Sequence, residues 1–223
     1  EELESVTAGI SGRLHVGTIL SASPVLLPRA IAQLQRAAPG IYVEVVEGLV
    51  APLIDRLQRH EIDLIIGPLD PRAHHAGLQM EGLMHDIFSI VTRPGHPLAK
   101  LRRPTWRDAA QYPWIMPPLA TVSRTRLEEA FARAGVAAPS PRIETASIVA
   151  LQALLHETGY VTCLAGSVAQ LYRRLKLVDI VPMREQLDFG LIGMMWQAGA
   201  ASRVLPQLQE CLRHEARELQ GDA

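Results

Sequence analysis

Residues 57–67 read LQRHEIDLIIG, and this stretch decides the fold class of the chain. The apolar run Leu64–Ile66 is short and directly follows charged residues, which is typical of a strand buried on both faces of a parallel sheet. Apolar residues at helical spacing come just before it and predict a short helix that packs on this sheet: Leu53, Ile54 and Leu57.

A strand, a helix and a second strand are expected upstream of that stretch. Residues 13–18 alternate as a strand, and Ser23 can cap a helix that has Pro24 at its first position. That helix should end at Pro39-Gly40, before a strand over residues 41–47. Because strands and helices alternate, the pattern predicts right-handed crossovers and a parallel sheet.

A second α/β series follows a long extended segment at residues 78–91. Its expected strands are 115–116, 142–145 and 160–164, and its expected helices are 123–134, 148–156 and 167–175. A strand at 189–196 could then carry the chain back to the first lobe, where an amphipathic helix at 202–219 is expected. The predicted fold class is therefore α/β, with two Rossmann-like lobes joined by two crossover strands. Lobe I should comprise residues 11–90 and 198–223, and lobe II residues 91–197.

Composition excludes several classes of protein. The formal net charge of −1 argues against a nucleic-acid-binding surface, which needs clustered cations. Cys163 and Cys211 form no disulfide framework and no metal motif, so we expect two buried, reduced thiols. No apolar run is long enough to span a bilayer, and the acidic start lacks the basic region of a signal peptide.

Motifs for catalysis, metals and cofactors are missing. Neither a P-loop nor a GxGxxG fingerprint occurs, and Gly166-Ser167 lacks the second glycine of a nucleophile elbow. His156-Glu157 begins like a zinc motif, but Tyr160 stands where the second histidine should be. We interpret His74-His75 as a solvated loop, and Asp63 and Asp70 as capping or turn residues. The expectation is a protein that is not an enzyme and has no metal and no cofactor.

Loops at the carboxyl ends of the predicted strands carry the candidate ligand contacts, because ligands of parallel sheets collect there. The candidates are rich in hydroxyls, glycine and proline: Thr18, Ser21, Ser23, Gly67, Pro68, Pro117, Thr121, Thr145, Ser147 and Gly166. Several precede helices, whose free N–H groups suit a carboxylate, sulfonate or phosphate. Simple N-capping is the alternative for each hydroxyl. Apolar residues would add a hydrophobic wall: Ile19, Leu20 and Pro117.

Four sequence motifs carry a family resemblance. They are GRLHVG (12–17) followed by SPVLLP (23–28), PGIYVEVVEG (39–48), LQRHEIDLIIG (57–67) and GHPL (95–98). In this order and spacing, the chain resembles the effector-binding domain of LysR-type transcriptional regulators over essentially its whole length.

The resemblance implies a periplasmic-binding-protein-like fold of type 2. It also implies that residues 1–10 end a linker helix that follows a winged helix-turn-helix DNA-binding domain missing from this sequence. A small effector, expected to be an organic acid or similar anion, would lie between the lobes against residues 18–23, 67–68 and 145–147. The family further implies a cytoplasmic homodimer or homotetramer that contacts DNA only through the missing domain and contacts no membrane.

The chain departs from the family pattern at two places in the predicted lobe II. Thr158-Gly159-Tyr160 and Ala165 stand where the family often has a Gly-Leu-Gly stretch and a proline, which leaves the shape of the lobe II wall undefined.

Two alternative functions are compatible with the sequence. An extracytoplasmic solute-binding protein of the same fold is one alternative, and an upstream signal peptide would support it. An enzyme on a two-lobed scaffold is the other, and turnover of bound ligands would reveal it.

Overall fold

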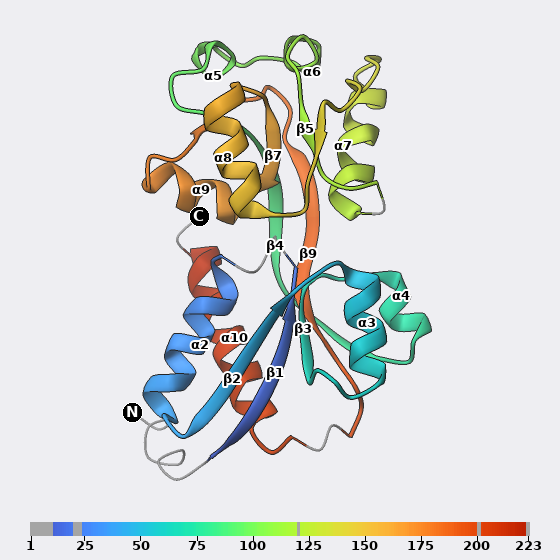
Figure 1. Cartoon of the computed structure of the whole chain (residues 1–223), viewed down its shortest axis with the longest axis vertical. Helices are drawn as coiled ribbons and strands as arrows, with labels where there is room; N and C mark the ends of the chain where they lie inside the picture. Colours follow the sequence, from blue (N-terminus) through green and yellow to red (C-terminus); the bar gives the residue numbers. More distant parts are fainter. Residues whose placement is uncertain (1–10, 20–23, 120, 200–201, 222–223) are drawn as a thin grey trace. The chain divides into compact units, whose positions relative to one another are not determined.

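The computed structural model describes residues 11–19, 24–119, 121–199 and 202–221 (Figure 1). Contacts divide the chain into two compact units. Unit 1 runs to His85 and resumes at Leu191, while unit 2 is Asp86–Gly190. These boundaries come a few residues earlier than the expected lobe boundaries after Ile90 and Gln197. The expected linker-helix segment at residues 1–10 lies outside the described residues.

Unit 1 is built on three parallel strands in the order β2-β1-β3. Its elements in chain order are β1 (Gly12–Thr18), α2 (Leu26–Ala37), β2 (Ile41–Glu47), α3 (Val50–Gln58), β3 (Leu64–Pro68) and α4 (Pro71–His75). In the register of the sheet, Val16 lies between Val45 of β2 and Leu64 of β3. The strand–helix–strand alternation predicted around residues 57–67 is confirmed.

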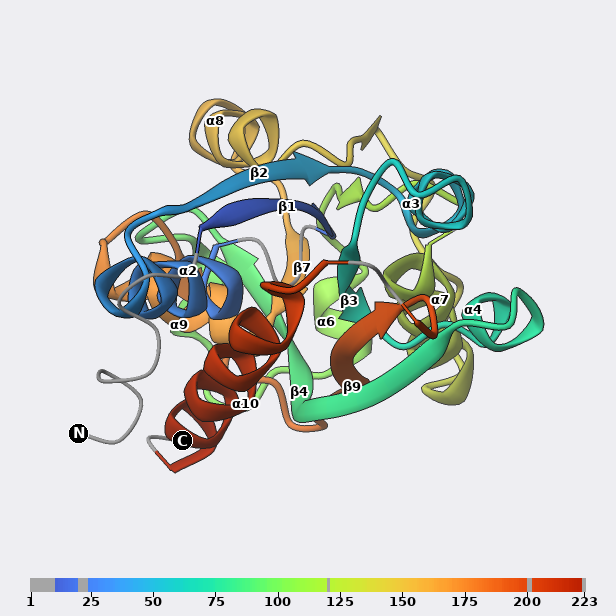
Figure 2. The same ribbon diagram turned by 90° about the horizontal axis from the view of Figure 1, so that it is seen from below.

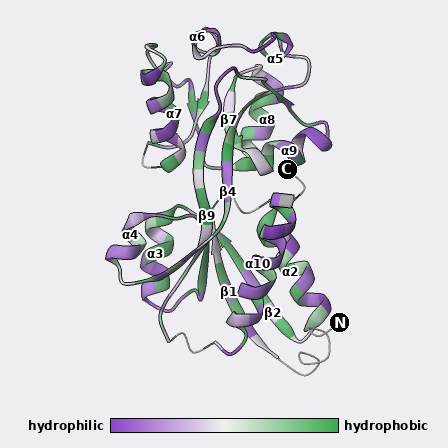
Figure 3. Cartoon of the chain, turned by 180° about the vertical axis from the view of Figure 1, so that it is seen from behind, coloured by the Kyte–Doolittle hydropathy of each residue, from purple (hydrophilic) through white to green (hydrophobic). Residues whose placement is uncertain are grey.

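Helices cover both faces of the unit 1 sheet. Helix α2 packs against α10 (Leu205–Gly221) on one face, and α3 and α4 lie on the other face (Figure 2). All five residues of β3 are buried, as expected for a central strand covered on both sides. The hydropathy colouring agrees, because hydrophobic residues concentrate on the strands while the helices also carry hydrophilic residues (Figure 3).

Two long strands carry the chain between the units. Strand β4 (Gln79–Thr92) contains the first boundary, and β9 (Leu187–Trp196) contains the second. In unit 1, β9 runs antiparallel to β3, with Ile65 opposite Met195. In unit 2, β4 pairs antiparallel with β7 and β8.

Unit 2 contains a second α/β series with short strands. Its elements are α5 (Pro97–Lys100), α6 (Trp106–Ala109), β5 (Ile115–Met116), α7 (Val122–Arg133), β6 (Ile143–Glu144), α8 (Ile148–Thr158), β7 (Thr162–Ala165), α9 (Gly166–Arg174) and β8 (Asp179–Ile180). Strands β5 and β6 are parallel, and a parallel bridge between Trp114 and Val161 brings β7 alongside β5. Phe131 packs edge-on against both Trp106 and Trp114, with ring centroids 5.1 and 5.4 Å away.

Three local predictions can be compared with these elements. Helix α2 begins at Leu26 with Val25 at its N-cap, so the prediction that Pro24 is the first residue of this helix is wrong, and Ser23, its predicted cap, lies outside the described residues. His74-His75 lie in helix α4, so the predicted loop there is also wrong. The capping role of Asp70 is confirmed, because its carboxylate accepts a hydrogen bond from the Arg72 backbone N–H at 2.8 Å.

Candidate ligand-binding segments

Unit 1 brings two of the expected segments together at the carboxyl ends of β1 and β3. The Ile19 N–H donates to the Ile66 carbonyl at 3.0 Å, and the Gly48 N–H donates to the Thr18 carbonyl at 3.0 Å. A Cβ added at Gly67 would lie 2.4 Å from Cδ1 of Ile19, closer than atoms can approach. Glycine is therefore needed at position 67 so that the segment after β1 can cross the end of β3.

Thr18 does not present its hydroxyl to solvent. The residue is fully buried, and its hydroxyl donates to the carbonyl of Ile19 at 3.4 Å. Pro68 is buried as well, whereas Ile19 is partly exposed. Two other candidates, Ser21 and Ser23, and the apolar Leu20 lie outside the described residues.

Unit 2 brings four candidates together at the neighbouring ends of β5 and β6. The Thr145 N–H donates to the Met116 carbonyl at 3.2 Å, which extends the pairing of the two strands into the segments that follow them. Pro117 directly follows β5, and Thr121 caps α7 by accepting from the Arg124 backbone N–H at 3.2 Å. Ser147 caps α8 in the same way, accepting from the Ala150 N–H at 3.3 Å.

The first turn of α8 has the free donors that an anion needs. The Thr145 hydroxyl accepts from the Ser147 N–H at 3.0 Å, and the Ser147 hydroxyl accepts from the Ala150 N–H. Within the described part of the chain, the intervening N–H groups of Ile148 and Val149 have no hydrogen-bond acceptor. Ser147 is exposed, and Val149 is 75% exposed, so this turn faces solvent. It combines free backbone donors, the positive end of a helix dipole and apolar surface.

Gly166 stands at a helix start of a different kind. The buried carboxylate of Asp86 accepts from the Ser167 hydroxyl at 2.8 Å and from the Ser167 N–H at 3.4 Å. Its other oxygen accepts from the Ile87 N–H at 2.7 Å. Burial raises the pKa of Asp86, and these hydrogen bonds oppose the rise. The N-terminus of α9 therefore already holds a carboxylate of the protein itself.

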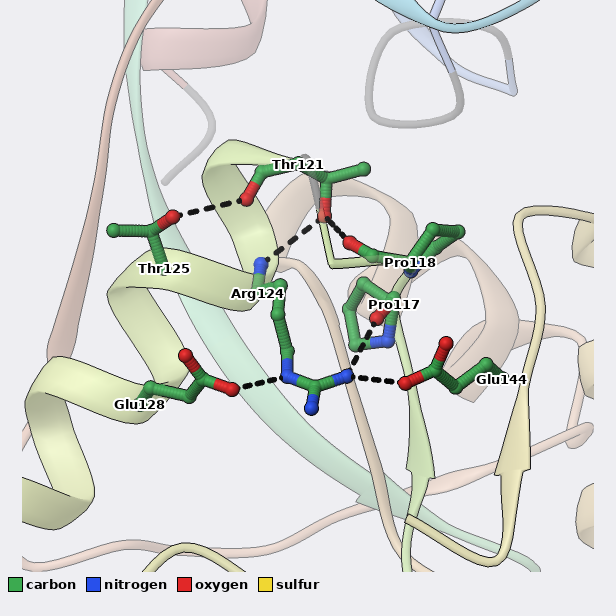
Figure 4. Close-up of polar contacts among 7 residues, drawn as sticks. All are labelled: Pro117, Pro118, Thr121, Arg124, Thr125, Glu128 and Glu144. Atoms are coloured by element: carbon green, nitrogen blue, oxygen red, sulfur yellow. Dashed lines mark hydrogen bonds and ion pairs between the residues drawn. The ribbon is translucent and has the colours of Figure 1, made fainter.

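Two charged residues near these segments were missed from the sequence. Asp86 is one of two acidic residues, with Glu81, in a mostly apolar extended stretch, and Arg124 belongs to an amphipathic helix in which an arginine is normally solvated. Instead, the Arg124 side chain is buried and contacts both Pro117 and Glu144 (Figure 4). Burial lowers the pKa of Arg124, but hydrogen bonds to Glu144 and Glu128 raise it overall.

The described residues contain no group of histidine, cysteine and carboxylate side chains that could hold a metal ion. Both cysteines are buried free thiols, and burial raises the pKa of Cys163 to about 12 and that of Cys211 to about 11. Such thiols are protonated at neutral pH and are poor nucleophiles. Among the described helices, none is long and apolar enough to cross a membrane.

Two α/β units joined by two strands, with hydroxyl-capped helices at strand ends, form the architecture of the periplasmic-binding-protein-like class. A putative transcriptional regulator from Vibrio parahaemolyticus shares this fold with a TM-score of 0.79 and 19% identity, covering 94% of this chain and 96% of that one. The cofactor-binding domain of the Cbl transcriptional regulator gives a TM-score of 0.77 at 19% identity, covering 96% of each chain. The predicted type 2 fold is confirmed.

The family described as LysR substrate binding domain matches residues 7–217, and the chain belongs to this family. The HTH-type transcriptional regulator GbpR of Azospirillum brasilense is 30% identical over 197 residues, which cover 88% of this chain and 58% of that protein. The chain thus spans about half the length of the curated relatives it matches. It is a ligand-sensing regulatory domain, and the alternative of an extracytoplasmic solute-binding protein is not favoured.

Proposed function

We propose that this chain senses a small organic anion on behalf of a LysR-type transcriptional regulator and is not an enzyme. The observation that carries the proposal is the first turn of α8, where the N–H groups of Ile148 and Val149, which have no acceptor among the described residues, lie beside the hydroxyls of Thr145 and Ser147. A carboxylate or phosphate placed there would accept from neutral donors at the positive end of a helix dipole. The exposed side chain of Val149 favours a ligand that also has an apolar part.

Within this proposal, the remaining candidate contacts are Thr121 and Pro117 in unit 2 and the segments at residues 18–23 and 67–68 in unit 1. Thr18 would support this segment from beneath and would not contact the ligand itself, because the whole residue is buried and its carbonyl already accepts from the Gly48 N–H. Gly166 would leave room for the Asp86 carboxylate at the start of α9. It would donate no hydrogen bond to the ligand, because Asp86 already accepts the hydrogen bonds at that helix start.

For the whole protein, we propose a cytoplasmic homodimer or homotetramer that binds DNA through an N-terminal helix-turn-helix domain. The relatives GbpR and GalR are HTH-type transcriptional regulators, which supports this assignment. The effector would act by binding one conformation of the oligomer more tightly than another, which shifts the population toward that conformation.

Thermal unfolding of this chain with and without sodium salts of acetate, succinate, benzoate, gluconate and glycerol 3-phosphate tests the proposal. An anion present at about 100 times its Kd adds about 2.7 kcal/mol to the free energy of unfolding. For a chain of this size, that raises Tm by roughly 5–11 °C. Sodium chloride at matched ionic strength is the control. If no member of the panel raises Tm above this control, an organic-anion sensor is contradicted, and turnover of any of these compounds would indicate an enzyme.

A further inference from the structure

Arg124 is a buried cation whose side chain joins three separate segments of unit 2. Its Nη1 donates to the Pro117 carbonyl at 3.1 Å and to Oε1 of Glu144 at 2.8 Å, while its Nε donates to Oε1 of Glu128 at 2.5 Å (Figure 4). Only 8% of the Arg124 side chain is exposed, compared with 38% of Glu144 and 46% of Glu128. The guanidinium group is thus enclosed by protein, and the two carboxylates reach it from the surface.

Two of these three segments belong to the proposed anion site. Pro117 is the first residue after β5, and Glu144 is the last residue of β6, immediately before Thr145. Strands β5 and β6 pair over only two residues, Ile115 with Ile143 and Met116 with Glu144. So short a ladder constrains the following loops weakly, and Arg124 adds a charge-assisted link at the point where the strands end.

The backbone of the same residue takes part in fixing the start of α7 relative to these loops. The Arg124 backbone N–H donates to the Thr121 hydroxyl, and that hydroxyl donates to the Pro118 carbonyl at 2.7 Å. The loop between β5 and α7 is therefore held at Pro117 by the Arg124 side chain and at Pro118 and Thr121 through the cap. Lysine, with a single ammonium group, could not reproduce the fork that reaches Pro117, Glu144 and Glu128 together.

Arg124 is not suited to binding the anion directly. Glu128 and Glu144 both contact its guanidinium group, so the three side chains together carry a net charge of −1. An incoming carboxylate would meet two carboxylates of the same sign at close range, which is unfavourable in a partly buried position. Arg124 joins the loops of the site but cannot pair with the ligand. Any effect that it has on binding therefore acts through the geometry of those loops.

We propose that Arg124 is a positioning residue that holds the segment after β5 and the segment after β6 in the arrangement that binds the anion. The inference rests on the proposed function for the identity of the site, and it assigns to Arg124 a role that involves no contact with the ligand. It also explains why an arginine occupies the core-facing side of α7, next to the buried Leu127.

The test compares a charge-neutral triple variant with a matched surface variant. Arg124→Met combined with Glu128→Gln and Glu144→Gln removes the link without leaving an unpaired charge, so Tm should stay close to that of the wild type. Arg126→Met is the control, because Arg126 lies on the same helix and, among the described residues, pairs only with Glu129, at 3.4 Å on the exposed surface. Amide hydrogen exchange of the whole chain is measured for all three proteins.

We expect amide exchange in the peptides that follow Pro118 and Glu144 to accelerate about tenfold in the triple variant, because a charge-assisted link between them is lost. Exchange in the rest of unit 2 should be unchanged, and Arg126→Met should match the wild type throughout. Unchanged exchange in both peptides would overturn the inference. An equal acceleration across unit 2 would overturn it too, because Arg124 would then support general stability only.

The anion panel gives a second readout that separates this inference from the proposed function. The panel member that raises Tm of the wild type most should bind the triple variant about tenfold more weakly by calorimetry and bind Arg126→Met unchanged. If no panel member stabilises the wild type, the proposed function fails, while the exchange comparison still decides whether Arg124 positions the two segments. Full affinity in the triple variant would overturn the positioning role alone.

Discussion

Helices α8 and α9 both begin next to a serine at the end of a strand, yet their first turns are used differently. At α9, the buried carboxylate of Asp86 accepts from Ser167, and the helix start is closed. At α8, the neutral hydroxyl of Ser147 caps one N–H, and the N–H groups of Ile148 and Val149 have no acceptor among the described residues. The comparison teaches that a helix N-terminus is available to a ligand only where the protein does not supply its own anion.

The largest expected effect comes from crowding the closed helix start. A Cβ at Gly166 would lie 2.9 Å from Oδ1 of Asp86 and 3.0 Å from the Ile87 carbonyl, and the latter is backbone that cannot move away cheaply. Gly166→Ala should therefore lower the free energy of unfolding by about 2 kcal/mol, measured by urea denaturation. Gly48→Ala is the control, because the nearest atom there is a Leu53 side-chain carbon at 3.4 Å. Equal losses in both variants would contradict a closed start at α9.

The ionisation of Asp86 should make the stability of α9 depend on pH. Burial raises the pKa of Asp86 above its usual 3.8, so the folded chain keeps this proton to a higher pH than the unfolded chain does. The resulting stabilisation is complete below the unfolded pKa and is lost as pH rises through the folded pKa. Relative to Asp86→Asn, the wild type should therefore gain stability as pH falls from about 7 to about 4. Parallel urea-unfolding curves across this range would contradict the prediction.

Substitutions at the N-terminus of α8 should lower the free energy of unfolding less than Gly166→Ala does at α9. Ser147→Ala removes the side-chain cap of α8 and should lower the free energy of unfolding by about 1 kcal/mol. It should also weaken binding of the most stabilising panel anion by about 0.5–1.5 kcal/mol, because one neutral hydrogen bond is lost. Ser147→Thr keeps a hydroxyl and should restore most of both quantities. Unchanged calorimetric affinity in the alanine variant would remove Ser147 from the site.

The smallest change in stability should come from making α8 resemble α9. Ser147→Asp supplies an internal carboxylate at the N-terminus of α8 and should change the free energy of unfolding by only about 0.3–1 kcal/mol, in the stabilising direction. The same charge should repel anions, so the increase in Tm produced by the panel should disappear. If Ser147→Asp still responds to anions like the wild type, the anion is bound elsewhere.

Much of the fold could be predicted because its strands and helices follow simple periodicities. The strand at residues 41–47 matches β2 residue for residue, and the fully apolar run before Gly67 forms the buried centre of β3. Helix α4 was missed because it is only five residues long and depends on a local cap at Asp70. The start of α2 was misplaced because Ser23-Pro24 has the pattern of an N-terminus, although helical geometry begins only at Leu26.

The candidate site was only partly accessible from the sequence. The roles of Thr121, Thr145 and Ser147 near helix starts follow from local hydroxyl chemistry, which acts over two or three residues. Asp86 and Arg124 could not be found in this way, because Asp86 meets a residue 81 positions away and Arg124 meets Glu144 20 positions away. Their burial is decided by packing between distant segments, which has no local signature.

The discontinuity of unit 1 has a consequence for synthesis on the ribosome. Unit 2 is one continuous segment, whereas α2 near the start of the chain packs against α10, which is translated after the whole of unit 2. Until residues 205–221 emerge, the apolar face of α2, which includes Leu26, Ala30 and Leu34, lacks this partner. Unit 2 can therefore complete its fold first, and the nascent chain carries an uncovered helix face that chaperones can recognise in the meantime.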